Sequence, residues 1–132
     1  LKLKGYSNDQ TSDKIIDNSS SSNSVIELTI SYLKIDNLII SGGTRGVEVF
    51  GNSLLWADNV TVESYTQRGI NIDSSSVGWL GNVTVDGTKQ SASDEMGIRF
   101  GRGSNGYIYG TTTVKGNSSD SGGIFNPITL KR

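Results

Sequence analysis

Acidic side chains at four positions have the residue type that hydrolyses glycosidic bonds when two of them converge. They lie on predicted β-strands or at strand ends: Asp58, Glu63, Asp73 and Asp86. Glycoside hydrolysis needs two carboxyl groups about 5 to 9 Å apart, a separation that equivalent positions on neighbouring strands can reach. No complete catalytic motif accompanies these candidate catalytic residues, and the alternative is that they are solvated acids in turns. The sequence therefore favours a protein that is not an enzyme.

Glu63 and Asp86 occupy equivalent positions, because each follows a Val-Thr-Val run. We expect them one strand apart, where two carboxylates repel each other unless a cation binds or one of them has a raised pKa. Calcium is a cation that carboxylate oxygens would hold. The sequence shows no third oxygen ligand, so no metal or other cofactor is predicted, with calcium as the alternative. The chain has no Cys and no His, which excludes disulfides, zinc sites and His-dependent triads.

Both tryptophans of the chain occur at equivalent positions, three residues before an Asn-Val-Thr-Val block. Trp56 and Trp79 should therefore lie in one column on successive strands, where flat aromatic surfaces can bind sugar rings. Tyr107 and Tyr109 extend this candidate glycan-binding site. The alternative is that the two indoles form an aromatic layer of the core. In the outer repeats the predicted column contains Lys34 and Ile108.

Four asparagines begin an Asn-x-Ser or Asn-x-Thr triplet, the acceptor pattern for N-linked glycans: Asn18, Asn59, Asn82 and Asn117. Asn59 and Asn82 also start their predicted strands at the position that Asn37 has in the preceding repeat. Side-chain amides stacked in this way hydrogen-bond along the axis of the repeat. The sequence favours such a ladder of amides, with glycan attachment as the alternative.

The elements that must hold these side chains follow from an internal repeat. The block that begins at Asn59 recurs 23 residues later at Asn82, and a Gly-led strand recurs at Gly46, Gly69 and Gly97. A period of this length is typical of proteins built from stacked repeats. Alternation along each strand predicts which side chains point inward and which form solvent-facing columns. We expect a core of Val47, Val49, Val60, Val62, Ile70, Ile72, Val83, Val85, Ile98 and Phe100, and outward columns of Glu48, Asn71 and Arg99 and of Thr61, Thr84 and Thr113.

The composition limits the class of protein. With 17 Gly, 1 Pro and many Ser, Thr, Asn and Val, the 132 residues favour strands joined by turns and fit a single domain. A formal net charge of -1 argues against nucleic acid as a partner. No apolar stretch approaches the ~20 residues that cross a bilayer, so no membrane insertion is expected. One local cluster, Arg99 to Gly103, could hold a sulfate, phosphate or uronate, although exposed cations in loops usually bind nothing specific.

Three segments are predicted along the chain. Residues 1–24 form a polar amino-terminal segment, which contains a short alternating run and a Ser-rich stretch. This segment acts either as a linker or as a strand exchanged with another chain. Residues 25–126 contain the repeats, and residues 127–132 form a carboxy-terminal tail.

The Asn-Val-Thr-Val blocks and the Gly-Ile-Asn-Ile-Asp strand that begins at Gly69 resemble the right-handed parallel β-helix, or pectin-lyase-like, superfamily over roughly Val25 to Phe125. The resemblance implies an all-β fold, a single-stranded right-handed parallel β-helix (β-solenoid) of about four to five coils. The superfamily includes polysaccharide lyases, glycoside hydrolases, phage tailspikes and surface adhesins. It therefore also implies a carbohydrate-facing protein that is extracellular, on a cell surface or on a virion.

From these features we expect an extracellular structural subunit that self-associates into a fibre or appendage and carries or contacts glycans. Its partners would be copies of the same chain, joined by coil stacking or strand exchange in a homo-oligomer, because the ends of a short solenoid expose unpaired strand edges. One alternative is the polysaccharide-binding module of a phage tailspike or adhesin, which requires Trp56 and Trp79 to be exposed. Another is a fragment of a polysaccharide lyase or glycoside hydrolase, which requires acids that converge in a cleft.

Overall fold

The computed structural model describes residues 1–4, 14–17, 23–88, 96–115 and 124–125, and this part of the chain contains β-strands and no helix. Val, Ile and aromatic residues recur in the strands, as expected of residues that fit a pleated surface. The strands are β1 (Lys2–Lys4), β2 (Lys14–Asp17), β3 (Ser24–Thr29), β4 (Tyr32–Gly42), β5 (Arg45–Phe50), β6 (Leu54–Glu63), β7 (Arg68–Ile72), β8 (Val77–Gly81), β9 (Thr84–Asp86), β10 (Met96–Phe100), β11 (Asn105–Tyr109), β12 (Thr113–Lys115) and β13 (Ile124–Phe125).

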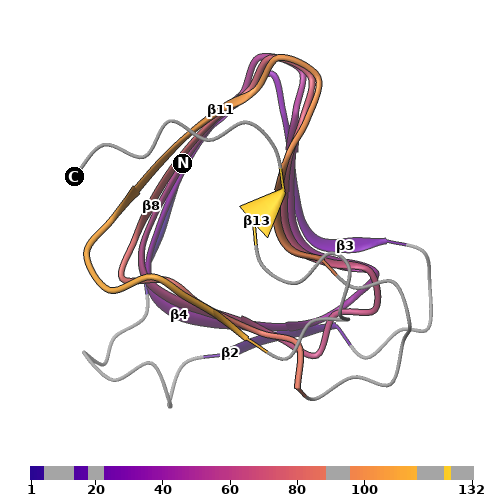
Figure 1. The fold of residues 1–132 in the computed structure, drawn as a ribbon, viewed down its shortest axis with the longest axis vertical. Coiled ribbons are helices and arrows are strands. Elements are labelled where there is room, and N and C mark those ends of the chain that lie inside the picture. Colours follow the sequence, from indigo (N-terminus) through magenta and orange to yellow (C-terminus); the bar gives the residue numbers. More distant parts are fainter. Residues whose placement is uncertain (5–13, 18–22, 89–95, 116–123, 126–132) are drawn as a thin grey trace.

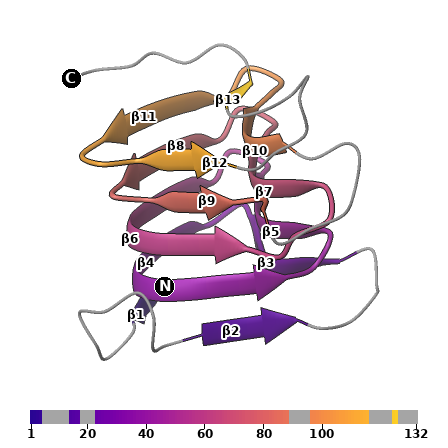
Figure 2. The same cartoon turned by 60° about the horizontal axis from the view of Figure 1, so that its bottom comes forward.

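The described strands form two hydrogen-bonded sheets in which the paired strands run parallel. The larger sheet is 8-stranded, with the order β1-β4-β6-β8-β11, β2 beside β4, and β9 between β6 and β12. The smaller sheet is 5-stranded, with the order β13-β10-β7-β5-β3. Figure 1 looks along the stack, so that successive strands overlie one another around a shared interior. Figure 2 shows β2, β4, β6, β9 and β12 one above the other.

The all-β class is confirmed, but the predicted single-stranded right-handed parallel β-helix of about four to five coils is wrong. The described strands are mostly short and form two separate sheets. The larger sheet also branches, which a regular stack of identical coils would not do. β6 pairs with β8 from Leu54 to Asp58 and with β9 from Thr61 to Glu63. The repeat in the sequence predicts which residues become neighbours, but it does not predict where hydrogen bonding is interrupted between them.

Asparagines bend the chain within the larger sheet. Asn37, Asn59 and Asn82 have φ angles of 54°, 54° and 51°, and asparagine is one of the few residues that occupy this left-handed region readily. The amide of Asn59 donates to Oδ1 of Asn37, which confirms the predicted ladder for this pair. Nδ2 of Asn82 donates to Oδ1 of Asp58 at 2.9 Å, and for Asn82 the ladder stays a prediction. The larger sheet turns a corner at these bends, so that β8 and β11 lie on one side of the molecule and β2 on another (Figure 1).

Inward-pointing side chains from both sheets form one apolar core. The predicted members are each at most 1% exposed: Val47, Val49, Val60, Val62, Ile70, Ile72, Val83, Val85, Ile98 and Phe100. Both predicted outward columns are in register across their strands. One expectation for these columns is wrong, because Asn71 is 1% exposed and therefore does not face solvent.

Both strands of the amino-terminal segment add to the larger sheet of their own chain. β1 pairs with the first half of β4, and β2 pairs with the second half. The segment boundaries at residues 1–24, 25–126 and 127–132 stay predictions, and the tail lies outside the described residues. Among the described residues there is no helical segment with the length and apolar character of a membrane span.

Candidate functional site

The predicted sugar-binding residues lie together on the larger sheet. Lys34 of β4 pairs in register with Trp56 of β6, Trp56 with Trp79 of β8, and Trp79 with Tyr107 of β11. Alternation along the strands places these four side chains on the same face of the sheet. They therefore form one column across neighbouring strands.

The prediction that Ile108 belongs to this column is wrong. Ile108 pairs with Leu80, whose side chain is fully buried on the inner face. Tyr107 lies 28 residues after its neighbour Trp79, whereas Thr113 of β12 lies 29 residues after Thr84. One extra residue therefore lies between β11 and β12, and an alignment by the spacing of β12 misplaces β11 by one residue. A slip of one residue moves every side chain of a strand to the opposite face.

The aromatic rings of the column stack on one another. The ring centroids of Trp56 and Trp79 are 5.4 Å apart at an interplanar angle of 12°, and those of Trp79 and Tyr107 are 4.4 Å apart at 27°. Nζ of Lys34 lies 5.6 Å from the centroid of the Trp56 ring, within the range of a cation–π interaction. The three aromatic side chains are half-buried, so they lie outside the core and do not form the core layer that was the alternative.

A second column runs beside the first and contains Asp36, Asp58, Gly81 and Tyr109. The Tyr109 ring fills the space over Gly81, because a Cβ on Gly81 would lie 2.1 Å from Cε2 of Tyr109. Burial raises the pKa of Tyr109 and the charges of Asp58 and Asp36 raise it further, whereas a hydrogen bond with Trp56 opposes them. We call the set of Lys34, Asp36, Trp56, Asp58, Trp79, Tyr107 and Tyr109 the aromatic face.

The candidate catalytic acids lie in three separate places. Asp58 belongs to the aromatic face, Asp73 follows β7 in the smaller sheet, and Glu63 and Asp86 end β6 and β9. Sequence reasoning missed Asp36, which is the in-register neighbour of Asp58. The signal was present, since Asp36 precedes Asp58 by the spacing that separates Asn37 from Asn59.

Glu63 and Asp86 are in-register neighbours, as predicted. The cation beside them is Lys115, whose Nζ lies 3.1 Å from Oδ2 of Asp86. Burial alone would raise the pKa of Asp86, but hydrogen bonds from the hydroxyl and amide of Thr88 and the contact with Lys115 outweigh it and lower the pKa. Within the part of the chain that the structure describes, no group of three or more acidic, His or Cys residues could hold a metal ion. A calcium site stays a prediction.

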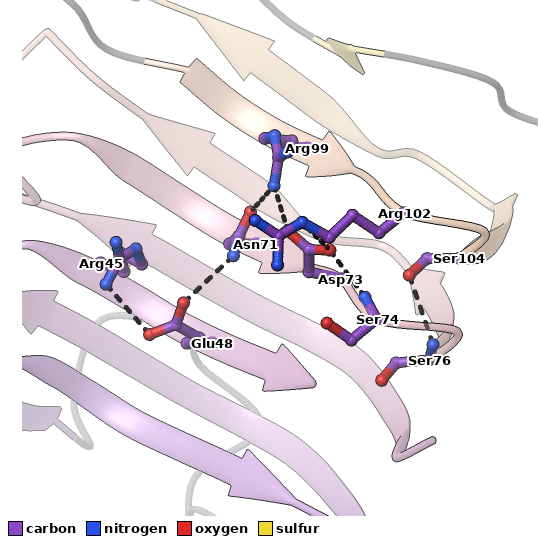
Figure 3. A network of polar contacts seen from close by, with 9 residues as sticks. All are labelled: Arg45, Glu48, Asn71, Asp73, Ser74, Ser76, Arg99, Arg102 and Ser104. Carbon is purple, nitrogen blue, oxygen red and sulfur yellow. Dashed lines mark hydrogen bonds and ion pairs between the residues drawn. The ribbon is translucent and has the colours of Figure 1, made fainter. Parts of the chain in front are cut away.

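Asp73 belongs to a polar network on the smaller sheet (Figure 3). Nη1 of Arg99 donates to Oδ2 of Asp73 at 2.6 Å and to Oδ1 of Asn71 at 3.0 Å. Nδ2 of Asn71 donates to Oε1 of Glu48 at 3.2 Å, and Nη1 of Arg45 donates to Oε2 of Glu48 at 3.0 Å. Arg99 is therefore paired with side chains of the protein, whereas the sequence suggested a free cation in a turn.

The pKa values of Asp73 and Asp86 both lie below the ordinary value of 3.8. Burial alone would raise the pKa of Asp73, but hydrogen bonds from Arg99 and the Ser74 amide, with the charges of Arg99 and Arg102, lower it by more. A carboxyl group with a depressed pKa stabilises the folded state fully above its unfolded pKa of about 3.9. That contribution is lost as the pH falls through the lower pKa of the folded state.

Acid should therefore lower the melting temperature. We expect a Tm that is steady from neutral pH to about pH 5 and that falls below about pH 4. Circular dichroism melts at successive pH values measure this dependence. The Asp73→Asn variant should start from a lower Tm and lose less of it on acidification, and an equal loss in both proteins would contradict the assignment to Asp73.

Two of the four predicted glycan acceptors lie within the described residues, and their side chains are in hydrogen bonds. Asn59 bonds to Asn37. Asn82 donates to Asp58, and its Oδ1 accepts from the amide of Thr111 at 3.1 Å. A glycan on Nδ2 would disturb these bonds. Asn18 and Asn117 lie outside the described residues, so attachment stays a prediction at every position.

No protein-family model, curated protein or solved structure matches this chain. The resemblance to the pectin-lyase-like superfamily therefore stays a prediction from the sequence motifs. The function has to be argued from the geometry of the chain's own side chains.

Proposed function

We propose that this protein binds neutral glycans on its aromatic face. The observation that carries the proposal is the stack of Trp56, Trp79 and Tyr107 on three neighbouring strands, outside the core. A contiguous row of partly exposed apolar rings is typical of a binding surface. Sugar rings have apolar faces that pack against aromatic rings of this kind.

The geometry of the stack leaves aromatic surface available to a ligand. The 5.4 Å between the centroids of Trp56 and Trp79 exceeds the ~3.5–4.0 Å at which carbon atoms make contact, although the rings are nearly parallel. Such rings are offset from each other rather than directly superposed. The offset leaves part of each ring face uncovered by its neighbour, and a sugar ring can pack on that part.

Polar groups beside the rings suit the hydroxyl groups of a sugar. Asp36 and Asp58 lie in the adjacent column and accept hydrogen bonds, and Lys34 donates them from the end of the stack. Lys2 of β1 pairs in register with Lys34, so two ammonium groups stand against the two carboxylates and this surface has no excess charge to attract an anionic sugar. This balance supports neutral glycans as the ligand class. An extracellular location and self-association into a fibre stay predictions.

Intrinsic fluorescence tests this proposal directly, because both tryptophans of the chain belong to the aromatic face. Titration with neutral oligosaccharides, such as hexamers of glucose, xylose and mannose, should give a saturable change in emission with at least one of them. A hexamer of galacturonic acid serves as the anionic control and should bind more weakly. If no neutral oligosaccharide changes the emission and no insoluble polysaccharide retains the protein, the proposal is wrong.

A further inference from the structure

A pocket of about 330 Å³ lies on the smaller sheet, away from the aromatic face. Its size is at the lower end of the range of small-molecule sites. The pocket is rich in charged and polar side chains and includes one aromatic ring. Its lining residues are Glu27, Arg45, Glu48, Phe50, Arg68, Asn71, Asp73, Ser74 and Arg102.

Two of the three acids in this pocket are already neutralised by the protein. Glu48 is paired with Arg45, and Asp73 with Arg99 and Arg102, at distances of 3.0, 2.6 and 3.7 Å. Within the described residues, the ion pairs of this pocket do not include Arg68. The pocket is lined by three acids and three arginines, and Arg99, which pairs with Asp73, is a fourth arginine, so this cluster has one positive charge in excess.

Arg68 is also placed unfavourably for a cation. It is the in-register neighbour of Arg45 on the adjacent strand, and like charges at directly opposed positions destabilise a sheet. Burial lowers the pKa of Arg68 and the charges of Arg99 and Arg45 lower it further, whereas the charges of Glu48 and Asp73 oppose them without cancelling the decrease. Among the described residues, the buried Nε of Arg45 has no hydrogen-bond partner. That atom has almost no accessible surface, and Nη1 of Arg45 is bound to Glu48, so Arg68 is the guanidinium group that a ligand would engage.

We propose that this pocket binds a small organic carboxylate, held by Arg68. A guanidinium group matches the two oxygens of a carboxylate in a bidentate arrangement. A singly charged anion fits better than a dianion, because Glu27, Glu48 and Asp73 line the same pocket. The carbon atoms next to the carboxylate would lie against Phe50, which is half-buried. This site is independent of glycan binding on the aromatic face.

Nuclear magnetic resonance of the ¹⁵N-labelled chain tests the proposal, with acetate and gluconate as probes at constant ionic strength. Both should cause saturable shifts of the Arg68 side-chain Nε–H and of the Asn71 backbone amide. Sorbitol, which matches gluconate without its charge, should cause none. Arg68→Gln should weaken gluconate binding roughly tenfold or more, because a charge-assisted hydrogen bond is lost. Lys2→Gln is the matched control, removes the same charge outside the pocket and should leave binding unchanged.

Thermal unfolding separates a binding role of Arg68 from a structural one. In buffer that contains chloride and no carboxylate, the Tm of Arg68→Gln should be no lower than that of the natural protein, because the change removes a contact between like charges. Gluconate should raise the Tm of the natural protein and not that of Arg68→Gln. Arg68→Lys, which keeps the charge without the planar fork, should bind with intermediate affinity. The proposal is overturned if neither carboxylate gives saturable shifts, if Arg68→Gln binds as well as the natural protein, or if sulfate binds more tightly than both.

Discussion

Replacing Trp79 by alanine should weaken the binding of neutral oligosaccharides roughly 30-fold, which corresponds to about 2 kcal/mol. Trp79 is the centre of the aromatic face, since its ring stacks on Trp56 on one side and on Tyr107 on the other. Its removal interrupts the row of rings and leaves no platform that spans the three strands. Isothermal titration calorimetry measures this loss without depending on the fluorescence that the change removes.

The matched control is Tyr32→Ala, which removes an aromatic ring that is 46% exposed at the start of β4. Tyr32 pairs with Leu54 and does not belong to the stack, so its removal should leave affinity unchanged. Gly81→Ala gives an intermediate test, because the new Cβ displaces the Tyr109 ring and leaves Trp79 in place. Equal affinities in the natural protein and in Trp79→Ala would show that the stack is only a structural ladder of rings.

Much of the core could be predicted from the sequence, because the alternation of side chains along a strand and the repeat can both be read from the order of the residues. The inward positions of β5, β7 and β10 follow from the period of two, and their burial is a direct consequence. The bends at Asn37, Asn59 and Asn82 were harder to predict. An asparagine at a strand end suits both a ladder of amides and a left-handed bend, and the sequence alone does not show that one residue does both.

The candidate sites were predicted less completely than the core. Trp56 and Trp79 share a period that places them together, but Tyr107 follows a lengthened repeat, and a count of residues assigned its place to Ile108. The pair of Arg45 and Arg68 escaped sequence analysis for another reason. Arg45 and Arg68 directly precede Gly46 and Gly69, so the repeat contained the signal. The pairing was not expected, because like charges on neighbouring strands are unfavourable.

Replacing Gly69 by alanine should destabilise the protein by about 3 kcal/mol, near the upper end for overpacking a core. A Cβ at this position would lie 2.3 Å from Cγ1 of Val85 and 2.7 Å from the carbonyl oxygen of Gly97. Val85 could change rotamer, but the carbonyl belongs to the backbone of the next strand, so the strands would have to separate. Urea denaturation followed by circular dichroism gives the free energy of unfolding.

The loss of stability at Gly69 comes from the lack of room for a Cβ and not from backbone strain, because Gly69 does not have a positive φ angle. Gly103 supplies the contrast: its φ is 76°, and the atom nearest to an added Cβ is Oγ of Ser75 at 3.5 Å. Gly103→Ala should therefore cost only the strain of a left-handed alanine, about 1 kcal/mol. Gly46 repeats the arrangement of Gly69 one strand earlier, with its Cβ position 2.8 Å from the carbonyl oxygen of Gly69. If Gly69→Ala lowers the free energy of unfolding no more than Gly103→Ala does, neighbouring strands can separate without cost. The repeated glycines would then not be what allows the strands to approach closely.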